Sequence, residues 1–416
     1  MSKLDELIAE LCPDGVPYKT LGELGYFYGG LSGKSKEDFT NGNAKFITYM
    51  NVFTNLAIDT DISDLVRIGE NEKQNTVQYG DILFTGSSET PDECGMSSVL
   101  TEVSDEKFYL NSFCFGFRLK DNNLLLPDFS KYLFRSQNIR KQIKRTANGV
   151  TRFNVSKKKM EQVVIPLPPL PVQQEIVRIL DNFTELTAEL TAELTAELTA
   201  RRKQYEYYRD LLLKFGDDVP MMALGDICTV QSGGTPSKAN HEYWDNGTIK
   251  WLGSTVCQNQ KTVDEVTNYI SELGLKNSSS KLMKKETTLI ALVGATIGKV
   301  AFLPFEAAIN QNIAGIYPID TSRINPSYVF YACSMLYSDF IGLSQGKLAM
   351  ANLSFVRGLK IPVPPLKEQE RIVAILDRFD ALCNDLTSGI PAEIEARQKQ
   401  YEYYRDKLLS FKEVTA

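Results

Sequence analysis

The sequence predicts an α+β protein. Two α+β domains are joined by two long helices that pair as an antiparallel coiled coil, and the whole chain is pseudo-two-fold. Three observations lead to this fold class. A long segment occurs twice at a constant offset, each copy has the length and apolar periodicity of a long helix, and the stretches between the copies combine short strands with a helix.

The repeat fixes the organisation of the chain. Ile165–Leu170 returns as Ile361–Leu366, and Lys203–Asp210 is identical to Lys399–Asp406, both at an offset of 196 residues. Between these blocks, the same offset continues through identical pairs that include Gln173/Gln369, Ile176/Ile372, Val177/Val373, Ile179/Ile375, Leu180/Leu376, Asp181/Asp377 and Phe183/Phe379. The segments therefore have equal length in both copies, and we divide the chain into domains at 1–165 and 216–361 and helices at 166–215 and 362–416.

Each repeated segment reads as a helix. The first has no proline or glycine from Val172 to Phe215 and carries apolar residues at helical spacing, which indicates one helix of unusual length. The second runs from about Lys367 to Phe411, where Gly389 and Pro391 predict a break or kink near the middle. Two amphipathic helices of matched length favour antiparallel pairing.

The first helix contains a short internal repeat. Thr187–Leu190 recurs as Thr191–Leu194 and Thr195–Leu198, after a shortened Thr184–Leu186. Because each residue turns a helix by about 100°, units of four place Leu, Thr and Ala on one face and leave Glu outside. A solvated low-complexity helix would explain the glutamates but not the unbroken leucines. We favour a spacer whose length is counted in units of about 6 Å.

The intervening blocks have the pattern of α+β domains. Four short apolar runs bounded by Gly, Pro or polar residues predict strands: Asp81–Thr85, Phe113–Arg118, Thr288–Val293 and Ile313–Tyr317. Pro127–Lys144 and Pro326–Leu343 predict one helix in each block.

Composition excludes several classes of protein. The 416 residues include 46 Lys and Arg against 52 Asp and Glu, and the net charge of -6 taken alone argues against a polyanionic partner. The chain has no apolar run of membrane-spanning length and no signal peptide, so we expect a cytoplasmic protein. Its seven scattered cysteines predict neither disulfides nor a zinc site. A single histidine, His241, removes most general-base schemes, and the sequence contains no methyltransferase, nucleotide-binding or nuclease motif.

The basic residues are nevertheless concentrated. Ten lysines and arginines lie between Lys131 and Lys159 with no acidic residue among them, although those near the end of the predicted helix also suit its C-terminal dipole. A phosphate-binding surface next to a loop that reads base edges is the functional interpretation. Its candidate DNA-binding residues are Arg140, Lys141, Lys144, Arg145, Asn148, Thr151 and Arg152.

Two glycine-rich loops suggest further contacts with a nucleic-acid backbone, although such loops are also common simple turns. Gly29–Lys36 lies in the first block and Ser232–Lys238 in the second. With a weaker basic counterpart in the second block, they add these candidate DNA-binding residues: Lys34, Lys36, Thr235, Ser237, Lys238, Lys299 and Lys347.

The order of these features resembles the specificity (S) subunit of type I restriction-modification systems, over essentially the whole chain. The resemblance rests on the duplicated Pro-Pro-Leu stops, the Lys-Gln-Tyr-Glu-Tyr-Tyr-Arg-Asp blocks, the tandem Thr-Ala-Glu-Leu units and the Gly233–Trp251 segment. The Thr-Ala-Glu-Leu units suggest the subgroup in which their number sets the gap between half-sites.

The resemblance implies a subunit without an active site of its own. Each variable block would be a target-recognition domain for one half of a bipartite double-stranded DNA sequence. Two modification (M) subunits would bind the conserved helices and methylate adenine with S-adenosylmethionine, and restriction (R) subunits would add ATP- and magnesium-dependent cleavage. A DNA-bridging structural or regulatory protein, acting without catalytic partners, is the alternative.

Aromatic clusters end both long helices. We expect them to pack at the ends of the coiled coil and partly against M subunits, while purely intramolecular packing is the competing interpretation. These candidate partner-binding residues are Tyr205, Tyr207, Tyr208, Arg209, Tyr401, Tyr403, Tyr404 and Arg405.

Overall fold

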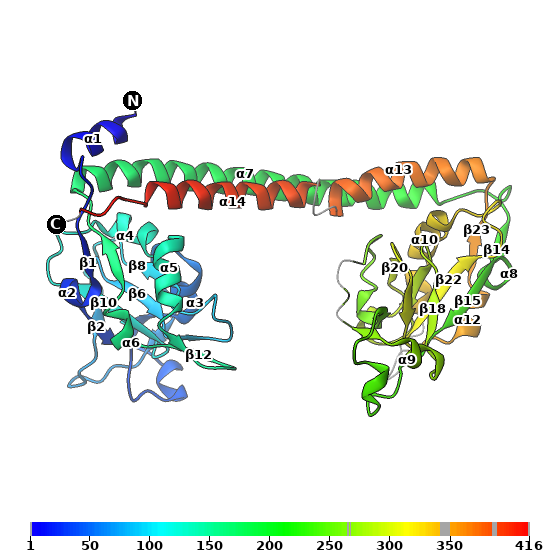
Figure 1. The fold of residues 1–416 in the computed structure, drawn as a ribbon, viewed down its shortest axis with the longest axis horizontal. Coiled ribbons are helices and arrows are strands. Elements are labelled where there is room, and N and C mark those ends of the chain that lie inside the picture. The colour runs from blue at the N-terminus through cyan, green and yellow to red at the C-terminus, as the bar shows by residue number, and fades with distance from the viewer. Residues whose placement is uncertain (1, 264–265, 267, 342–349, 385–388, 415–416) are drawn as a thin grey trace. The chain divides into compact units, whose positions relative to one another are not determined.

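The computed structural model describes residues 2–263, 266, 268–341, 350–384 and 389–414. It divides into two compact units, Met1–Thr191 with Ala396–Ala416, and Ala192–Glu395. The boundary falls within the long helix α7 (Leu170–Leu212), so each unit consists of one α+β domain together with parts of the long helices (Figure 1). This agrees with the α+β class, the two domains and the long helices expected from the repeat.

The first domain precedes α7. Its elements are α1 (Lys3–Leu11), β1 (Tyr18–Thr20), α2 (Leu21–Leu24), β2 (Gly25–Gly29), η1 (Lys36–Phe39), β3 (Ala44–Ile47), α3 (Tyr49–Thr54), β4 (Leu65–Val66), β5 (Thr76–Val77), β6 (Ile82–Thr85), β7 (Ser87–Ser88), β8 (Ser97–Val99), β9 (Phe108–Leu110), β10 (Cys114–Leu119), α4 (Pro127–Leu133), α5 (Gln137–Lys144), β11 (Ala147–Asn148), β12 (Phe153–Val155), α6 (Lys157–Met160) and β13 (Val164–Pro166).

The second domain follows α7 with the same succession of central elements. It comprises β14 (Met221–Ala223), α8 (Leu224–Ile227), β15 (Cys228–Ser232), η2 (His241–Tyr243), β16 (Ile249–Leu252), η3 (Ser254–Val256), β17 (Tyr269–Ile270), α9 (Glu272–Lys276), β18 (Lys281–Met283), β19 (Thr288–Ala291), η4 (Gly294–Thr296), β20 (Val300–Phe302), β21 (Ala307–Ile309), β22 (Ile313–Pro318), α10 (Pro326–Ser334), α11 (Tyr337–Ile341), α12 (Leu353–Gly358) and β23 (Lys360–Pro362), and then α13 (Leu366–Asn384) and α14 (Ile390–Leu408).

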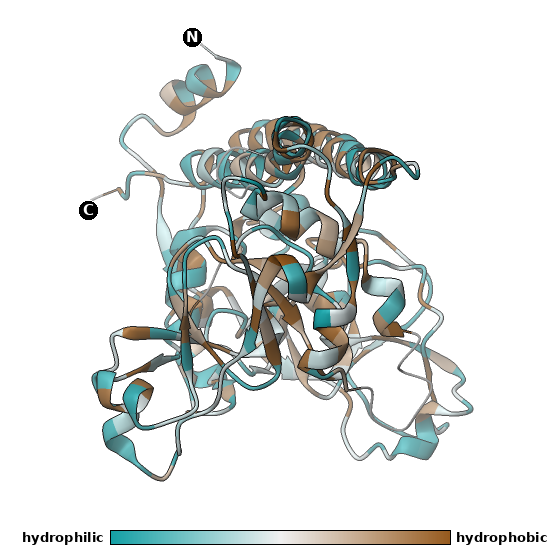
Figure 2. Cartoon of the chain, turned by 90° about the vertical axis from the view of Figure 1, so that its right-hand side faces the viewer, coloured by the Kyte–Doolittle hydropathy of each residue, from teal (hydrophilic) through white to brown (hydrophobic). Residues whose placement is uncertain are grey.

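A four-stranded antiparallel sheet forms the centre of each domain. Its strand order is β2-β10-β6-β8 in the first domain and β15-β22-β19-β20 in the second. All four predicted strands are found in these sheets as β6, β10, β19 and β22, and most of their residues are buried. Figure 2 shows the central strands of the second domain largely brown, or hydrophobic, and the loops at its lower end mostly teal.

The long helices begin inside the domain cores. In the first unit, Val172, Ile176 and Leu180 of α7 are fully buried in the same hydrophobic cluster as helix α4. In the second unit, Ile372 and Leu376 of α13 occupy the corresponding place. Each helix is therefore part of the domain beside it and not only a connection between domains.

The helices pair antiparallel within each unit. Phe183 near the start of α7 stacks on Tyr404 near the end of α14, with ring centroids 6.0 Å apart. Tyr208 near the end of α7 stacks on Phe379 of α13 at 5.6 Å. Both stacks join the same two positions of the repeat in exchanged order, as the pseudo-two-fold relation requires. The predicted break in the second helix falls between α13 and α14, and residues 385–388 lie outside the described part of the chain.

Residues from the C-terminal end complete the first domain. The Val16 amide donates to the Lys412 carbonyl at 2.8 Å, the Val414 amide donates to the Val16 carbonyl at 3.1 Å, and the Tyr18 hydroxyl donates to the Phe411 carbonyl at 2.9 Å. In the second domain, the residues that directly follow α7 take the role that residues 411–414 have in the first domain. Of these, Leu213 and Phe215 pack in the core.

The single helix predicted over Pro127–Lys144 is wrong, because the structure has α4 and α5 there. The Ser136 hydroxyl and amide both donate to the Leu133 carbonyl, and the Gln137 amide turns instead to the carboxylate of Asp406 at 2.9 Å. The second domain repeats the interruption between α10 and α11, where the Ser334 hydroxyl donates to the Tyr331 carbonyl at 2.6 Å. Serine side chains that bond to the backbone compete with helix continuation.

Candidate nucleic-acid interface

The loops that carry the candidate DNA-binding residues lie together at one edge of each central sheet, where its strands begin or end. Because neighbouring strands are antiparallel, the ends of β2 and β6 meet the starts of β10 and β8. The glycine-rich loop 29–36, the loop 86–96 and the β11–β12 hairpin therefore lie at this edge, near the bottom of the first domain in Figure 1. Loops 232–238 and 292–299 occupy the same edge of the second sheet.

The β11–β12 hairpin carries three exposed candidates. Gly149 has a φ of +143°, and a Cβ there would lie 1.9 Å from the Arg152 carbonyl oxygen, so this tight turn requires glycine. Next to it, Val150 is 91% exposed, with Asn148, Thr151 and Arg152 also exposed. The hairpin is an irregular, solvent-facing projection with one anchored cation.

Arg152 is the anchored residue of the hairpin. Its guanidinium donates to the Ser87 hydroxyl at 3.1 Å and lies 5.6 Å from the ring centroid of Phe113, which is itself 57% exposed. Hydrogen bonding and a cation–π contact hold the charge in one place without burying it. Such a guanidinium can present its remaining donors to a base edge or a phosphate.

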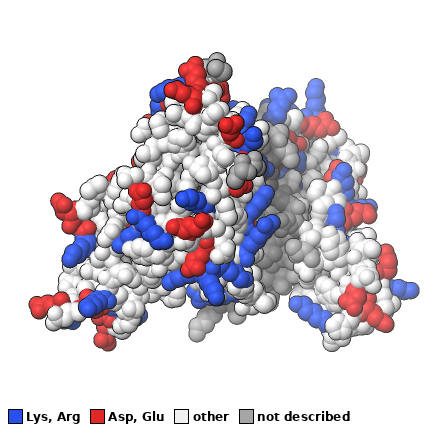
Figure 3. All heavy atoms as spheres, turned by 60° about the vertical axis from the view of Figure 1, so that its left-hand side comes forward, with Lys and Arg blue, Asp and Glu red and all other residues white. Residues whose placement is uncertain are grey.

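Further lysines and arginines of the basic cluster and of the glycine-rich loop are exposed. They are Lys36 on η1, Lys141 on α5, Arg145 directly after α5, and Lys157 and Lys158 on α6. Figure 3 shows Lys and Arg side chains gathered on the lower part of the first domain, where Figure 1 places α6 and β12. Lys159 donates to the Asn148 side-chain oxygen at 3.0 Å and so braces the hairpin.

Arg140 does not belong to this surface. It is 8% exposed, and its guanidinium donates to the carbonyls of Asp92, Cys94 and Gly95, while burial lowers its pKa to about 10. We therefore correct its assignment from phosphate binding to bracing the loop 92–95. Lys144 is half-buried beside it and forms an ion pair with Asp92 at 2.6 Å.

Two other members of the basic cluster also face the protein. The Lys131 ammonium lies between the carboxylates of Asp128 and Asp181, at 2.9 and 3.0 Å. Arg135 donates to backbone carbonyls of α3 and β8, including that of Ser97 at 2.6 Å. The uninterrupted run of basic residues in the sequence is thus divided in space between a surface and the domain interior.

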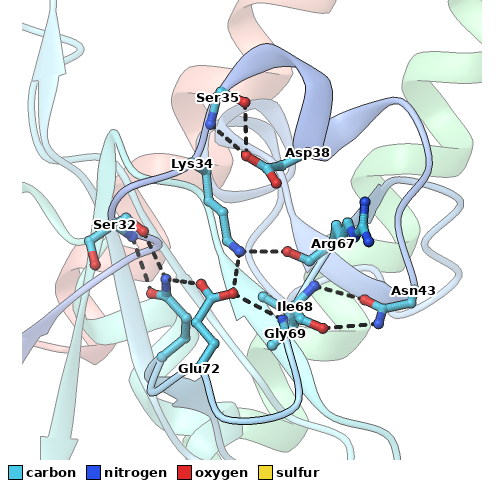
Figure 4. Close-up of polar contacts among 10 residues, drawn as sticks. Ser32, Lys34, Ser35, Asp38, Asn43, Arg67, Ile68, Gly69 and Glu72 are labelled. Carbon is cyan, nitrogen blue, oxygen red and sulfur yellow. Dashed lines mark hydrogen bonds and ion pairs between the residues drawn. The ribbon is translucent and has the colours of Figure 1, made fainter.

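Lys34 is likewise held within the protein, by the loop between β4 and β5 (Figure 4). Its ammonium donates to the Arg67 carbonyl at 2.5 Å and forms an ion pair with Glu72 at 2.6 Å, with only 8% of the side chain exposed. The Gly69 amide, together with Lys34 and Gln74, lowers the pKa of Glu72 to about 2. Lys34 therefore holds the glycine-rich loop in shape, and Lys36 is its exposed cation.

The corresponding loop of the second domain has a different brace. The Trp244 indole N–H donates to the Ser237 carbonyl at 3.2 Å, and that of Trp251 donates to the Gly234 carbonyl at 3.1 Å. The two rings are perpendicular, with centroids 5.3 Å apart. Both tryptophans of the chain thus fix one loop, a role that the sequence analysis did not foresee.

This bracing leaves the polar candidates at the tip of the second loop. Ser237 and Lys238 are exposed, and the Thr235 hydroxyl donates to the Gln311 side chain at 2.8 Å. Lys299 is half-buried, with its ammonium 3.4 Å from the Gln258 side-chain oxygen. Lys347 lies outside the described residues.

The aromatic clusters at the helix ends divide into two kinds of residue. Tyr205 packs against the second domain core, and Tyr208 and Tyr404 form the stacks described above. The Tyr401 hydroxyl shares a hydrogen bond with Thr184 at 3.1 Å. Arg209 and Arg405 pair with the neighbouring Asp210 and Asp406.

Tyr207 and Tyr403 differ from the other aromatic residues because they are 64% and 62% exposed. They stand at equivalent positions of the repeat. The aromatic cluster at each helix end therefore includes one tyrosine that is mostly exposed to solvent within the chain.

Neither a metal centre nor a membrane segment emerges from the described residues. None of their His, Cys, Asp and Glu side chains gather in threes in a way that would hold a metal ion. Every helix described is too short or too polar to cross a membrane.

Known proteins are similar to this chain in sequence and in fold. The chain matches the family described as type I restriction modification DNA specificity domain over residues 13–200 and again over 216–396. It is 41% identical to the EcoR124I/EcoR124II type I restriction enzyme specificity subunit of Escherichia coli over 62% of this chain and 65% of that protein. It is 39% identical to a putative type I restriction enzyme specificity subunit of Haemophilus influenzae over 63% of this chain and 68% of that one.

Two solved structures have the same fold along nearly the whole chain. One belongs to a study of complex assembly and conformational transition of a type I R-M system; its TM-score is 0.65 at 19% identity, with 96% of this chain and 98% of that chain covered. The other is the HsdS subunit of Thermoanaerobacter tengcongensis, with a TM-score of 0.51 at 16% identity and 97% and 98% coverage.

Replacing Arg140 tests its structural assignment. Arg140→Met removes three charge-assisted hydrogen bonds and leaves carbonyls of the 92–95 loop without their donor, so the free energy of unfolding should fall by about 3 kcal/mol. Exposed Lys141→Met is the matched control and should change it by less than ~0.5 kcal/mol. Urea denaturation measures both, and equal stability of the two variants would contradict the assignment.

Removing one indole N–H tests the brace of the second loop. Trp251→Phe keeps an aromatic ring but leaves the Gly234 carbonyl without its donor, so amide hydrogen exchange over residues 232–238 should accelerate about tenfold, the equivalent of ~1.4 kcal/mol. Mass spectrometry of exchanging peptides measures this, with residues 29–36 as the internal reference. Unchanged exchange in 232–238 would show that the indole does not hold the loop.

Proposed function

Because the chain belongs to the type I restriction-modification DNA specificity family, we propose that it is the subunit that reads a bipartite double-stranded DNA target, one half-site per domain. One observation supports this most strongly. The same sheet edge occurs in both domains and in both carries a braced glycine-rich loop with exposed cations and hydroxyls. A single reading surface would not require this duplication.

The exposed residues of the first domain suggest a division of labour at its half-site. Lys36, Lys141 and Arg145 are exposed and suit contacts with DNA phosphates. Such contacts position a protein on DNA. Asn148, Thr151 and Arg152 on the projecting hairpin suit base edges in the major groove, where amides and guanidinium groups distinguish base pairs. In the second domain, we assign contacts with the DNA backbone to Thr235, Ser237 and Lys238. Lys299 and Lys347 remain predictions.

We propose that other subunits perform the chemistry. Two modification subunits, carrying S-adenosylmethionine, would methylate adenines on opposite strands, as the pseudo-two-fold arrangement of the repeat favours. Restriction subunits would supply ATP- and magnesium-dependent cleavage. The chain itself would act by holding DNA and modification subunits together, in the cytoplasm.

The net charge of -6 is compatible with this role. Acidic residues are placed on the exposed face of α7, at Glu185, Glu189 and Glu193, whereas the exposed cations described above lie on the recognition edge. A protein that binds DNA together with larger subunits has no need of an overall positive charge. Acidic surfaces elsewhere would limit non-specific binding of the free chain.

Methylation mapping tests this function and the spacer proposed for α7. Co-expression with the modification subunits should methylate a bipartite sequence, and deletion of Thr191–Leu194 should shorten the gap between unchanged half-sites by about one base pair. One unit supplies ~6 Å of helix, base pairs are roughly 3.4 Å apart, and the helix axis need not run parallel to DNA.

The control for this deletion keeps the length of the helix. Glu189→Gln together with Glu193→Gln changes its charge but removes no residue, and should leave the gap unchanged. A deletion variant that methylates the original spacing would contradict the spacer. Absence of any bipartite motif with the complete chain would contradict the proposed function.

Replacing the two exposed tyrosines tests the contact with modification subunits. Tyr207→Ala and Tyr403→Ala remove rings that are solvent-exposed within the chain, so each should weaken assembly about tenfold, the loss of ~1.4 kcal/mol that one aromatic anchor commonly provides. Titration calorimetry with purified modification subunits measures the affinity. Tyr26→Ala, which removes a half-exposed ring from strand β2, serves as the control. Assembly of both helix variants at the affinity of the original chain would exclude these rings from the contact.

A further inference from the structure

Two polar residues of the repeat have no part in the function described above. Gln173 and Asp181 on α7 recur as Gln369 and Asp377 on α13. Both glutamines have no exposed surface, which is unusual for an amide side chain, and each must find hydrogen-bond partners inside the domain.

Gln173 makes these bonds where the first domain joins α7. Its amide nitrogen donates to the carbonyls of Leu124 and Pro168, at 2.9 and 2.8 Å, and its oxygen accepts from the Leu126 amide at 2.9 Å. Leu126 immediately precedes helix α4, so the glutamine ties the start of α4 to the first turn of α7.

Gln369 repeats the arrangement in the second domain atom for atom. Its nitrogen donates to the carbonyls of Arg323 and Pro364, at 3.0 and 2.8 Å, and its oxygen accepts from the Asn325 amide at 2.9 Å. Asn325 immediately precedes α10, the counterpart of α4. The two glutamines thus perform the same attachment in two domains of different sequence.

Asp181 provides a second attachment of α4 to α7. Its carboxylate accepts from the Tyr132 hydroxyl at 2.7 Å and pairs with the Lys131 ammonium at 3.0 Å. The Tyr132 side chain is 1% exposed, so its hydroxyl needs this acceptor and the nearby Thr184 hydroxyl, 3.1 Å away.

Asp377 forms the matching contact in the second domain, with a lysine of different origin. It accepts from the hydroxyl of fully buried Tyr331 at 2.5 Å and forms an ion pair with Lys261. Lys131 lies on the helix beside its tyrosine, whereas Lys261 lies on the loop between η3 and β17. The carboxylate is common to both helices, and each domain supplies its own cation.

Together these contacts attach each domain helix to its long helix at two points. On each long helix the glutamine and the aspartate are eight residues apart, which corresponds to about 12 Å along the axis. An attachment at one point permits rotation about it, while two points at this separation fix the direction of α4 on α7 and of α10 on α13. Apolar side chains could bury comparable area, but directed polar bonds select one orientation.

We propose that Gln173 with Asp181, and Gln369 with Asp377, are positioning residues that fix the orientation of each recognition domain on its long helix, and so determine how strictly the complex measures the distance between DNA half-sites. This proposal rests on the proposed function. The number of residues in α7 would set which spacing is preferred, and these two-point attachments would set how far other spacings are rejected.

The test uses the complete chain assembled with modification subunits. Asp181→Ala and Asp377→Ala remove the acceptor of a buried tyrosine and the partner of a lysine. Methylation rates are measured on DNA with the preferred gap and with gaps one base pair longer and shorter. For each variant, the preference for the correct gap should fall about tenfold, while the bases required in each half-site stay the same.

The controls remove equivalent carboxylates outside the attachments. Glu185→Ala on α7 and Glu370→Ala on α13 take an exposed carboxylate from the same two helices and should retain the original gap preference. If an aspartate variant folds poorly, Tyr132→Phe and Tyr331→Phe replace it, because they keep the ring in the core and remove only the hydroxyl that reaches the carboxylate.

The possible results separate this proposal from the function on which it rests. A complete chain without a bipartite target would overturn both. A complete chain with a strict gap, and variants that keep that strictness within about twofold, would overturn the positioning proposal alone. Variants that lose methylation equally on all three gaps would overturn it as well, because the residues would then contribute only to stability.

Discussion

The burial of one helix face in each domain is the interaction on which the rest of the structure depends. Val172, Ile176 and Leu180 of α7 lie in the core of the first domain, and Ile372 and Leu376 of α13 lie in the core of the second. Removing each of these side chains from water contributes roughly 2 kcal/mol. Because the helix supplies part of the core, a domain and its segment of long helix fold as one body, and the sheet edge opposite takes its position from that helix.

The two domains place different chemistry on one common frame. In both, amides of the glycine-rich loop donate to carbonyls just before the neighbouring strand of the sheet, β10 or β22, as in the 3.1 Å bond from the Gly234 amide to the Ile309 carbonyl. The side chains that fix each loop differ, however: Lys34 with Glu72 in the first domain, and Trp244 with Trp251 in the second. A shared backbone with exchangeable braces and tips would let each domain read its own half-site while the helices stay the same.

Elements that depend on chain periodicity could be predicted from the sequence. The offset of 196 residues, the apolar spacing of α7 and the four short strands all follow from patterns within one segment. The interruptions after Leu133 and Ser334 did not, because they depend on serine side chains and, for α5, on Asp406 from the far end of the chain. A pattern within one segment does not predict that its helix is capped by Asp406, a residue 269 positions away in the sequence.

The candidate site shows the same division more sharply. Lys141 and Arg152 of the charge cluster and Lys36 of the glycine-rich loop are exposed, whereas the side chains of Arg140 and Lys34 carry the same charge and are buried. Their partners are backbone carbonyls and a carboxylate from loops distant in sequence, which a count of basic residues does not reveal. The role of the two tryptophans could more easily have been predicted. Both lie within 20 residues of the loop that they fix, and an indole N–H that is partly buried needs an acceptor.

We propose that each domain carries its own reading edge for one half of the DNA target. Hydroxyl-radical footprinting of the target bound to the assembled complex tests it most directly, with the original chain compared to Arg152→Ala. We predict two protected tracts with an open gap between them, and selective loss of protection in the tract read by the first domain when Arg152 is removed. A single continuous tract, or equal fading of both tracts in the variant, would contradict the claim.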